Sequence, residues 1–246
     1  MLLNAPQREA IHYLDGPLLV LAGAGSGKTR VITQKIAYLI QECGFNPANI
    51  AAITFTNKAA REMQERITHM LGEKPKGITI STFHSLGVRL LREEATVLGY
   101  KPRFSIFDAT DCQAIVADLS GSVDKATIRR LQSIISNWKN GLVTPDAARH
   151  LASNETEALA ARVYLSYAAT LKAYQAVDFD DLIVLPVELF SQHPAVLDKW
   201  QNKLRYLLVD EYQDTNACQY TLLKLLTGPR AAFTAVGDDD QAIYGW

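Results

Sequence analysis

The residues with the clearest chemical potential form a short glycine-rich segment near the start of the chain, Ala22-Gly-Ala-Gly-Ser-Gly-Lys-Thr29. It follows an apolar run and precedes a helical pattern, which is the context that a phosphate-binding loop requires. Small residues let backbone N–H groups close around phosphate oxygens, and the following helix N-terminus adds a favourable dipole. Lys28 is expected to reach the β- and γ-phosphates of a nucleotide, and the Thr29 hydroxyl to bind Mg²⁺. The candidate nucleotide-binding residues of this loop are Ala22 (where such loops usually have glycine), Gly23, Ala24, Gly25, Ser26, Gly27, Lys28 and Thr29.

Two adjacent carboxylates follow a second apolar run, in Leu207-Leu-Val-Asp210-Glu211. Ligands of open α/β sheets bind at the carboxyl ends of the strands, so this position suits a nucleotide site. Asp210 is a candidate Mg²⁺ ligand, directly or through water. Glu211 is a candidate to orient and deprotonate the attacking water.

A third segment also places polar side chains after an apolar run: Val236-Gly-Asp-Asp-Asp-Gln241-Ala-Ile-Tyr-Gly-Trp246. Gln241 is a candidate sensor of the γ-phosphate. The rings of Tyr244 and Trp246 can stack on nucleic-acid bases. By themselves, such aromatic residues more often belong to a core or an interface.

Five short apolar runs are expected to form the strands that position these segments. They are Leu18–Leu21, Ile50–Phe55, Ile78–Ser81, Tyr206–Val209 and Phe233–Val236. Helical patterns over Lys28–Gln41 and Ala59–Leu71 follow the first two runs. This alternation predicts an α/β fold with a parallel sheet covered by helices.

Residues 82–205 separate the third and fourth strands and are too many for a normal crossover. Helices are predicted at Ser85–Leu98, Thr110–Leu119, Lys125–Trp138, Thr144–Leu151 and Glu155–Tyr174. Asp178 is a candidate cap of a further helix, which Pro186 is expected to kink. The expected organisation is an α/β domain made of residues 1–84 and 191–246, with a helical subdomain, residues 85–190, inserted into it.

Composition restricts the class of protein. The chain has 246 residues, 48% of them hydrophobic, 21% charged, and a net charge of −1, which excludes a disordered chain and a uniformly basic nucleic-acid binder. Residues 54–103 nevertheless hold nine Lys or Arg against five Glu, a local excess that suits nucleic acid. The three cysteines are far apart, and the start of the chain has no secretory pattern. A cytoplasmic protein without a membrane segment is expected.

Seven ordered segments together resemble the superfamily 1A (UvrD/Rep-like) ATP-dependent DNA helicases. They are Asn4-x-x-Gln7, the glycine-rich loop, Thr54-Phe-Thr-Asn-Lys-Ala-Ala60, Thr82-Phe-His84, Asp178-Phe-Asp-Asp-Leu182, Asp210-Glu-Tyr-Gln-Asp214 and Gly237-Asp-Asp-Asp-Gln-Ala-Ile-Tyr-Gly-Trp246. The resemblance covers the whole chain. Within the family, the segments 81–87, 136–140 and 178–183 are most similar to the Rep type, and the UvrD and PcrA types are close alternatives.

The resemblance implies a RecA-like P-loop NTPase domain, interrupted by an all-helical subdomain, that uses ATP and Mg²⁺. It implies that Gln7 reads the adenine edge, that Arg30 lies near the nucleotide sugar, and that Lys28, Thr29, Asp210, Glu211 and Gln241 serve the triphosphate. The residues implied to face single-stranded DNA are Phe55, Thr56, Asn57, Thr82, His84, Phe179, Tyr244 and Trp246. By residue type alone, Phe55 and His84 suit a packing role equally well.

The resemblance also implies the N-terminal part of a 3′-to-5′ helicase that translocates on single-stranded DNA and unwinds duplexes at junctions during replication or repair, where replication or repair proteins are candidate partners. In that family an arginine and a second RecA-like domain follow the residue matching Trp246, so the chain alone is expected to be nearly inactive. Two alternatives stay open. One is a nucleotide- or DNA-binding module without turnover. The other is a different P-loop enzyme such as a small-molecule kinase, which the segments 54–60 and 237–246 disfavour.

Overall fold

The computed structural model describes residues 3–23 and 25–238 of the chain. Contacts divide it into two compact units. The first unit contains the described residues up to Leu86, His193–Thr215, and the described residues from Leu223 onward. The second contains Gly87–Gln192 and Asn216–Leu222. Residues 216–222 thus group with the inserted segment, whereas the domain boundaries expected after residues 84 and 190 remain predictions.

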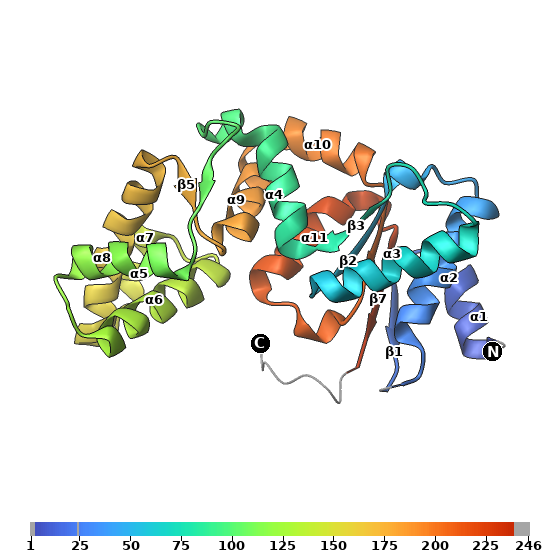
Figure 1. The fold of residues 1–246 in the computed structure, drawn as a ribbon, viewed down its shortest axis with the longest axis horizontal. Coiled ribbons are helices and arrows are strands. Elements are labelled where there is room, and N and C mark those ends of the chain that lie inside the picture. The colour runs from blue at the N-terminus through green and yellow to red at the C-terminus, as the bar shows by residue number, and fades with distance from the viewer. Residues whose placement is uncertain (1–2, 24, 239–246) are drawn as a thin grey trace. The chain divides into compact units, whose positions relative to one another are not determined.

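A five-stranded parallel sheet forms the centre of the first unit (Figure 1). The order of its strands is β1-β7-β6-β2-β3. Its strands are β1 (Leu18–Leu21), β2 (Ile50–Thr54), β3 (Thr79–Thr82), β6 (Tyr206–Val209) and β7 (Phe233–Gly237). Each neighbouring pair runs parallel, so the carboxyl ends of all five strands lie along one edge. The predicted mixed α/β fold with a parallel sheet is confirmed.

An apolar core joins the sheet to helices of the first unit. Buried residues recur at every second position in its strands and at every third or fourth position in its helices. The helices are α1 (Ala5–His12), α2 (Lys28–Gln41), α3 (Asn57–Leu71) and α10 (Pro194–Lys203). Ile50 and Ala52 of β2, two residues apart, lie in the same buried cluster as Ile32 and Ile36 of α2, which are four apart. These spacings place side chains on one face of a strand and one face of a helix, respectively. The α2 helix begins at the glycine-rich loop, and its buried face packs against the sheet.

The second unit is mainly helical. It contains α5 (Ala109–Ser120), α6 (Lys125–Asn140), α7 (Pro145–Leu151), α8 (Glu155–Ala173) and α9 (Asp181–Gln192), and residues of α4 (Phe83–Glu94) and α11 (Ala217–Thr227) fall in both units. It also contains a parallel pair of short strands, β4 (Ser105–Ile106) and β5 (Ala176–Val177). The prediction that this insertion is all-helical is therefore wrong in this detail, because a run of two residues is too short to show strand alternation.

Side-chain capping fixes the start of α9. Asp181 N–H donates to the Asp178 carboxylate (2.9 Å), and Asp178 N–H donates to the Asp181 carboxylate (3.2 Å). This reciprocal pair satisfies N–H groups at the start of α9, as Asp178 was expected to do. The helix then continues through Pro186 to Gln192. Among the helices of the described ranges, none is long and apolar enough to span a membrane.

Candidate nucleotide-binding site

Three segments that are far apart in the sequence meet at the carboxyl edge of the sheet. Ala22 follows β1, Asp210 follows β6 and Asp238 follows β7, and these three strands are neighbours. The Ala22 N–H donates to the Gly237 carbonyl over 3.0 Å, which joins the start of the glycine-rich loop to the end of β7. The sheet order therefore brings the loop and both acidic segments into one place.

The glycine-rich loop has the backbone that phosphate binding needs. Gly25 and Gly27 have φ angles of 71° and 90°, a left-handed conformation that side chains with a Cβ rarely adopt. Gly27 is the N-cap of α2, and the N–H groups of a first helical turn suit the binding of an anion. Of the candidate loop residues, Ala24 lies outside the described residues.

Lys28 is buried and held at the loop by two acceptors. Its Nζ donates to the Asp238 carboxylate over 3.1 Å and to the Ala22 carbonyl over 3.0 Å. Lys28 and Asp238 are 8% and 2% exposed, so this ion pair is shielded from water. A phosphate in the loop would compete with Asp238 for the ammonium group.

Thr29 and Asp210, the two candidate Mg²⁺ ligands, contact each other. The Thr29 hydroxyl donates to Asp210 Oδ2 over 3.0 Å, and Asp210 Oδ1 accepts the Glu211 N–H over 3.1 Å. Burial raises the pKa of Asp210 above its ordinary value, and the Thr29 hydrogen bond opposes this effect. The two side-chain oxygens fit Mg²⁺, which typically takes one or two protein ligands and completes its shell with water and phosphate oxygens. Within residues 3–23 and 25–238, no group of three or more His, Cys, Asp or Glu could form an all-protein metal site.

Glu211 is held in an unusual conformation beside Asp210, the candidate metal ligand. Its φ of 52° is left-handed, which costs free energy in a residue other than glycine and is common at functional sites. Gln213 Nε2 donates to Glu211 Oε2 over 2.7 Å, and Gln213 Oε1 accepts the Asp238 N–H over 3.0 Å. Gln213 therefore orients the carboxylate of Glu211, a role that sequence reasoning missed although the residue lies in a segment that it identified.

A cavity of about 330 Å³ opens beside these groups. It is lined by Gly25, Gly27, Lys28, Thr29, Arg30, Arg66 and Glu211. Arg66 lies in the middle of α3, where no local sequence signal distinguishes it from other surface arginines. Gln7, in α1, reaches the same loop, because its Nε2 donates to the Ser26 carbonyl over 2.9 Å.

Comparison with known proteins gives the family. Residues 3–246 match the family model described as UvrD/REP helicase N-terminal domain. The chain belongs to this family. The resemblance deduced from the seven segments is confirmed, and with it the RecA-like assignment of the sheet domain.

Relatives of this UvrD/REP domain are DNA helicases by name. The ATP-dependent DNA helicase Rep of Escherichia coli (strain K12) is 54% identical over 250 residues, which cover all of this chain and 37% of that protein. The protein of the same name in Buchnera aphidicola is 47% identical over 247 residues, with 100% and 37% coverage. The ATP-dependent DNA helicase PcrA of Staphylococcus epidermidis is 47% identical over 248 residues, with 99% and 34% coverage. The chain therefore spans little more than a third of the length of these relatives.

The predicted DNA-facing residues of the sheet unit lie at the ends of two adjacent strands. Phe55, Thr56 and Asn57 follow β2, and Thr82 and His84 are at the end of β3 or just after it. Thr56 caps α3 through its hydroxyl. Thr82 is only 7% exposed and its hydroxyl donates to Ser85 (3.0 Å), so in this structure it stabilises the start of α4. Contact of any of these residues with DNA stays a prediction.

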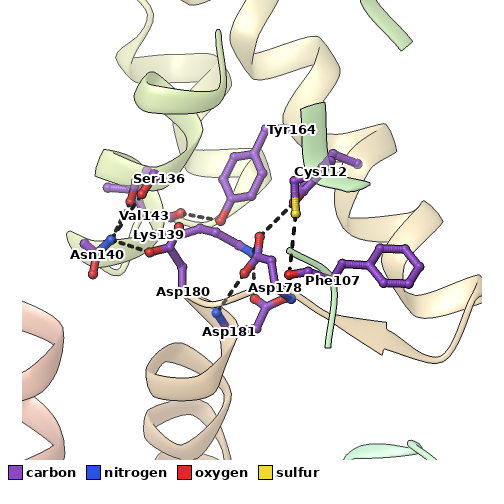
Figure 2. Close-up of polar contacts among 11 residues, drawn as sticks. Phe107, Cys112, Ser136, Lys139, Asn140, Val143, Tyr164, Asp178, Asp180 and Asp181 are labelled. Carbon is purple, nitrogen blue, oxygen red and sulfur yellow. Dashed lines mark hydrogen bonds and ion pairs between the residues drawn. The ribbon is translucent and has the colours of Figure 1, made fainter. Parts of the chain in front are cut away.

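Phe179 belongs to the helical unit. Figure 2 shows the polar contacts of its sequence neighbours Asp178, Asp180 and Asp181. The ring is 55% exposed, although both residues beside it are anchored. Lys139 Nζ lies 2.7 Å from the carboxylates of both Asp178 and Asp181, and Asn140 Nδ2 donates to Asp180 over 2.9 Å. Burial raises the pKa of Asp181 to about 6. An exposed aromatic ring on a rigid loop is a suitable stacking platform.

Three further predicted site residues belong to the segment after β7. Gln241, Tyr244 and Trp246 lie outside the described residues, so their roles remain predictions. The acid of the same segment that the structure does describe, Asp238, was not singled out by sequence reasoning. Its position after an apolar strand was the signal that could have identified it.

Proposed function

We propose that this chain forms the ATP-binding part, and some of the DNA-binding part, of an ATP-dependent DNA helicase that moves 3′-to-5′ along single-stranded DNA. The observation that carries this proposal is the meeting of Lys28, Thr29 and Asp210 at one sheet edge, in a chain of the UvrD/REP family. The names of the relatives support the reaction class, and the polarity rests on the family resemblance.

In this proposal the residues of the site divide the work on the triphosphate. Lys28 exchanges Asp238 for the β- and γ-phosphates, while the N–H groups at the start of α2 bind phosphate oxygens. Thr29 and Asp210 would hold Mg²⁺, which supplies charge neutralisation at those oxygens when bound. Glu211, oriented by Gln213, positions water and accepts its proton.

Recognition of the rest of the nucleotide and of DNA follows from the remaining positions. Gln7 reads the adenine edge and Arg30 lies near the sugar, while Gln241 is proposed as the γ-phosphate sensor. The strand-end residues and Phe179 bind single-stranded DNA, supported by the basic excess of residues 54–103. We place the protein in the cytoplasm, at single-strand/duplex junctions, with a second RecA-like domain and replication or repair proteins as partners.

Ligand-induced stabilisation tests the nucleotide site. Mg²⁺–ATP at roughly tenfold above its Kd should stabilise the chain by about 1.4 kcal/mol, measured as a shift in thermal unfolding. Lys28→Ala should abolish the shift because the phosphates lose their cation. Lys224→Ala, at an exposed lysine of α11, is the matched control and should keep it. An equal shift in the wild type and in Lys28→Ala would mean that the phosphate site is wrongly assigned.

Fluorescence anisotropy with labelled oligonucleotides tests the DNA proposal. The chain should bind single strands in preference to a blunt duplex, and affinity should fall as salt rises, because released counterions drive the binding. Tighter binding to the blunt duplex at every salt concentration would contradict the proposal.

A further inference from the structure

A buried lysine that the nucleotide site does not use lies beneath the first helix. Lys35, on α2, is 0% exposed. Its Nζ donates to the Ala10 carbonyl over 2.8 Å and to the Tyr13 carbonyl over 2.6 Å. The Tyr206 ring lies 5.8 Å from the same nitrogen. Lys35 thus connects α2 to the last turn and C-cap of α1.

These two carbonyls need a donor from elsewhere. The α1 helix ends at His12, and its last turn is closed by the bond from Tyr13 N–H to the Glu9 carbonyl. Carbonyls beyond this point have no intrahelical N–H partner. An ammonium group satisfies two of them at once, and its charge is favoured by the negative end of the helix dipole.

Burying the ammonium group of Lys35 costs desolvation free energy. Burial lowers the pKa of Lys35 to about 8, and the nearby Cys43 opposes that shift. An apolar side chain of similar volume would avoid the desolvation of a cation and often gives equal or greater stability. The presence of a cation therefore points to a role in placing α1 rather than in adding stability.

The other end of α1 carries the residue that meets the nucleotide. Asn4 and Gln7 cap each other's backbone, and Gln7 Nε2 donates to the Ser26 carbonyl of the phosphate loop. The Gln7 amide still has a second hydrogen and a second lone pair, which match the donor–acceptor edge of adenine. Guanine presents two acceptors on that edge and fits it less well.

The position of α1 depends on tertiary contacts, of which the two Lys35 bonds hold its C-terminal end. It is eight residues long, and its buried residues are Ala10 and Ile11. A helix this short has little stability of its own, so its position depends on tertiary contacts. It lies beside α2, which provides both Lys35 and the phosphate loop at its start (Figure 1).

We propose that Lys35 is a positioning residue for nucleobase selection: by anchoring the C-terminal end of α1, it sets where Gln7 meets the base of a nucleotide bound at the phosphate loop. This inference rests on the proposed function, because Gln7 can select a base only if the loop holds a nucleotide. Lys35 itself touches no part of the nucleotide in this scheme.

The test compares affinities of the 246-residue chain for Mg²⁺–ATP, Mg²⁺–GTP and Mg²⁺–tripolyphosphate by calorimetric titration. Lys35→Met should reduce the preference for ATP over GTP at least fivefold, while the affinity for tripolyphosphate changes less than twofold. Lys35→Arg, which keeps the donors, should restore most of the preference. In a Gln7→Ala background, Lys35→Met should have no further effect on the ratio, because it acts through Gln7.

Controls separate this role from a general loss of stability. Ile67→Ala removes core volume on α3 without touching the Lys35 bonds, and should leave the ATP-to-GTP ratio unchanged. If circular dichroism shows Lys35→Met unfolded, Lys35→Gln replaces it in the same cycle. An unchanged ratio in the Lys35 variant, equal losses for all three ligands, or a wild type that binds ATP and GTP equally would overturn the inference. A wild type that binds none of the three, tripolyphosphate included, would instead refute the nucleotide site itself.

Discussion

At the residue scale, the pairing of Lys28 with Asp238 would link the proposed phosphate binding to the end of β7. The ammonium group is already desolvated and aimed at the loop, so a phosphate meets an organised site. When phosphate takes over Lys28, the Asp238 carboxylate loses an ion-pair partner at 3.1 Å. Gln213 connects Asp238 to Glu211, so this exchange reaches the proposed catalytic base through two hydrogen bonds.

Lys35 gives a prediction for the dependence of stability on pH. Its folded pKa, about 8, is below the ordinary 10.5, so between these values the unfolded chain binds a proton that the folded chain does not. Stability must then rise with pH through this window. The neutral amine can still donate to both carbonyls. From pH 7 to pH 9 the unfolding free energy of the wild type should gain about 1 kcal/mol relative to Lys35→Met.

Urea denaturation of both proteins at several pH values would measure this difference. Using Lys35→Met as the reference removes the titration of other groups, such as Tyr206, whose pKa is raised by burial. A difference that stays flat or falls between pH 7 and pH 9 would contradict the assignment.

At the element scale, the contact between α4 and α9 requires a glycine. A Cβ built on Gly87 would lie 1.8 Å from the Leu182 carbonyl oxygen, which is backbone and cannot rotate away. Gly87→Ala should therefore destabilise the helical unit by roughly 3 kcal/mol or more, beyond the usual cost of overpacking. Gly16→Ala is the matched control, because the nearest atom to its Cβ is Tyr13 Oη at 3.7 Å. Chemical denaturation measures both, and equal stability of the two variants would refute the close packing.

The exposed ring of Phe179 leads to a prediction about single-strand binding. If the ring stacks on a base, Phe179→Ala should weaken single-strand binding by about 1–3 kcal/mol without changing the salt dependence, since no phosphate contact is lost. Tyr174→Ala, at an aromatic residue of the same unit that is 65% exposed, should leave affinity unchanged. Anisotropy titrations at three salt concentrations would measure both quantities. An equal loss in the two variants would mean that Phe179 has no special role.

At the scale of the whole molecule, we expect fast turnover to need a further domain, as the family resemblance implies. Lys28 and Glu211 line the cavity that we propose holds the triphosphate. The family resemblance implies that an arginine finger comes from a second RecA-like domain, and such a finger is worth about 10³–10⁵ in rate. The chain alone should therefore hydrolyse ATP at least about 10³-fold more slowly than a full-length relative, a barrier difference of roughly 4–7 kcal/mol.

Phosphate release with saturating single-stranded DNA measures this rate, and full-length Escherichia coli Rep serves as the positive control. The assay should span protein concentrations, since a neighbouring molecule could supply an arginine. DNA-stimulated turnover by the chain at a rate close to that of the relative, abolished by Glu211→Gln, would show that one RecA-like domain suffices.

Local sequence patterns were sufficient to predict the five strands of the parallel sheet and the candidate site residues at their ends. Strands such as Tyr206–Val209 were predictable because an unbroken apolar run suits a strand buried on both faces. The candidate phosphate loop and acid pair could be recognised in the sequence because each is a local pattern: glycines before a helix, and carboxylates directly after a strand.

Contacts between residues far apart in the sequence became visible only in the tertiary structure. Lys28 and Asp238 are 210 positions apart, and the order β1-β7-β6 brings them together; a local pattern cannot encode that order. Arg66 reaches the cavity because α3 packs beside α2, and its own neighbours in the sequence are those of any amphipathic helix. Lys35 shares its helix face with apolar residues such as Val31 and Leu39, but a lysine is seldom buried, and only the tertiary structure shows that α1 covers it and supplies the carbonyls that accept its hydrogen bonds.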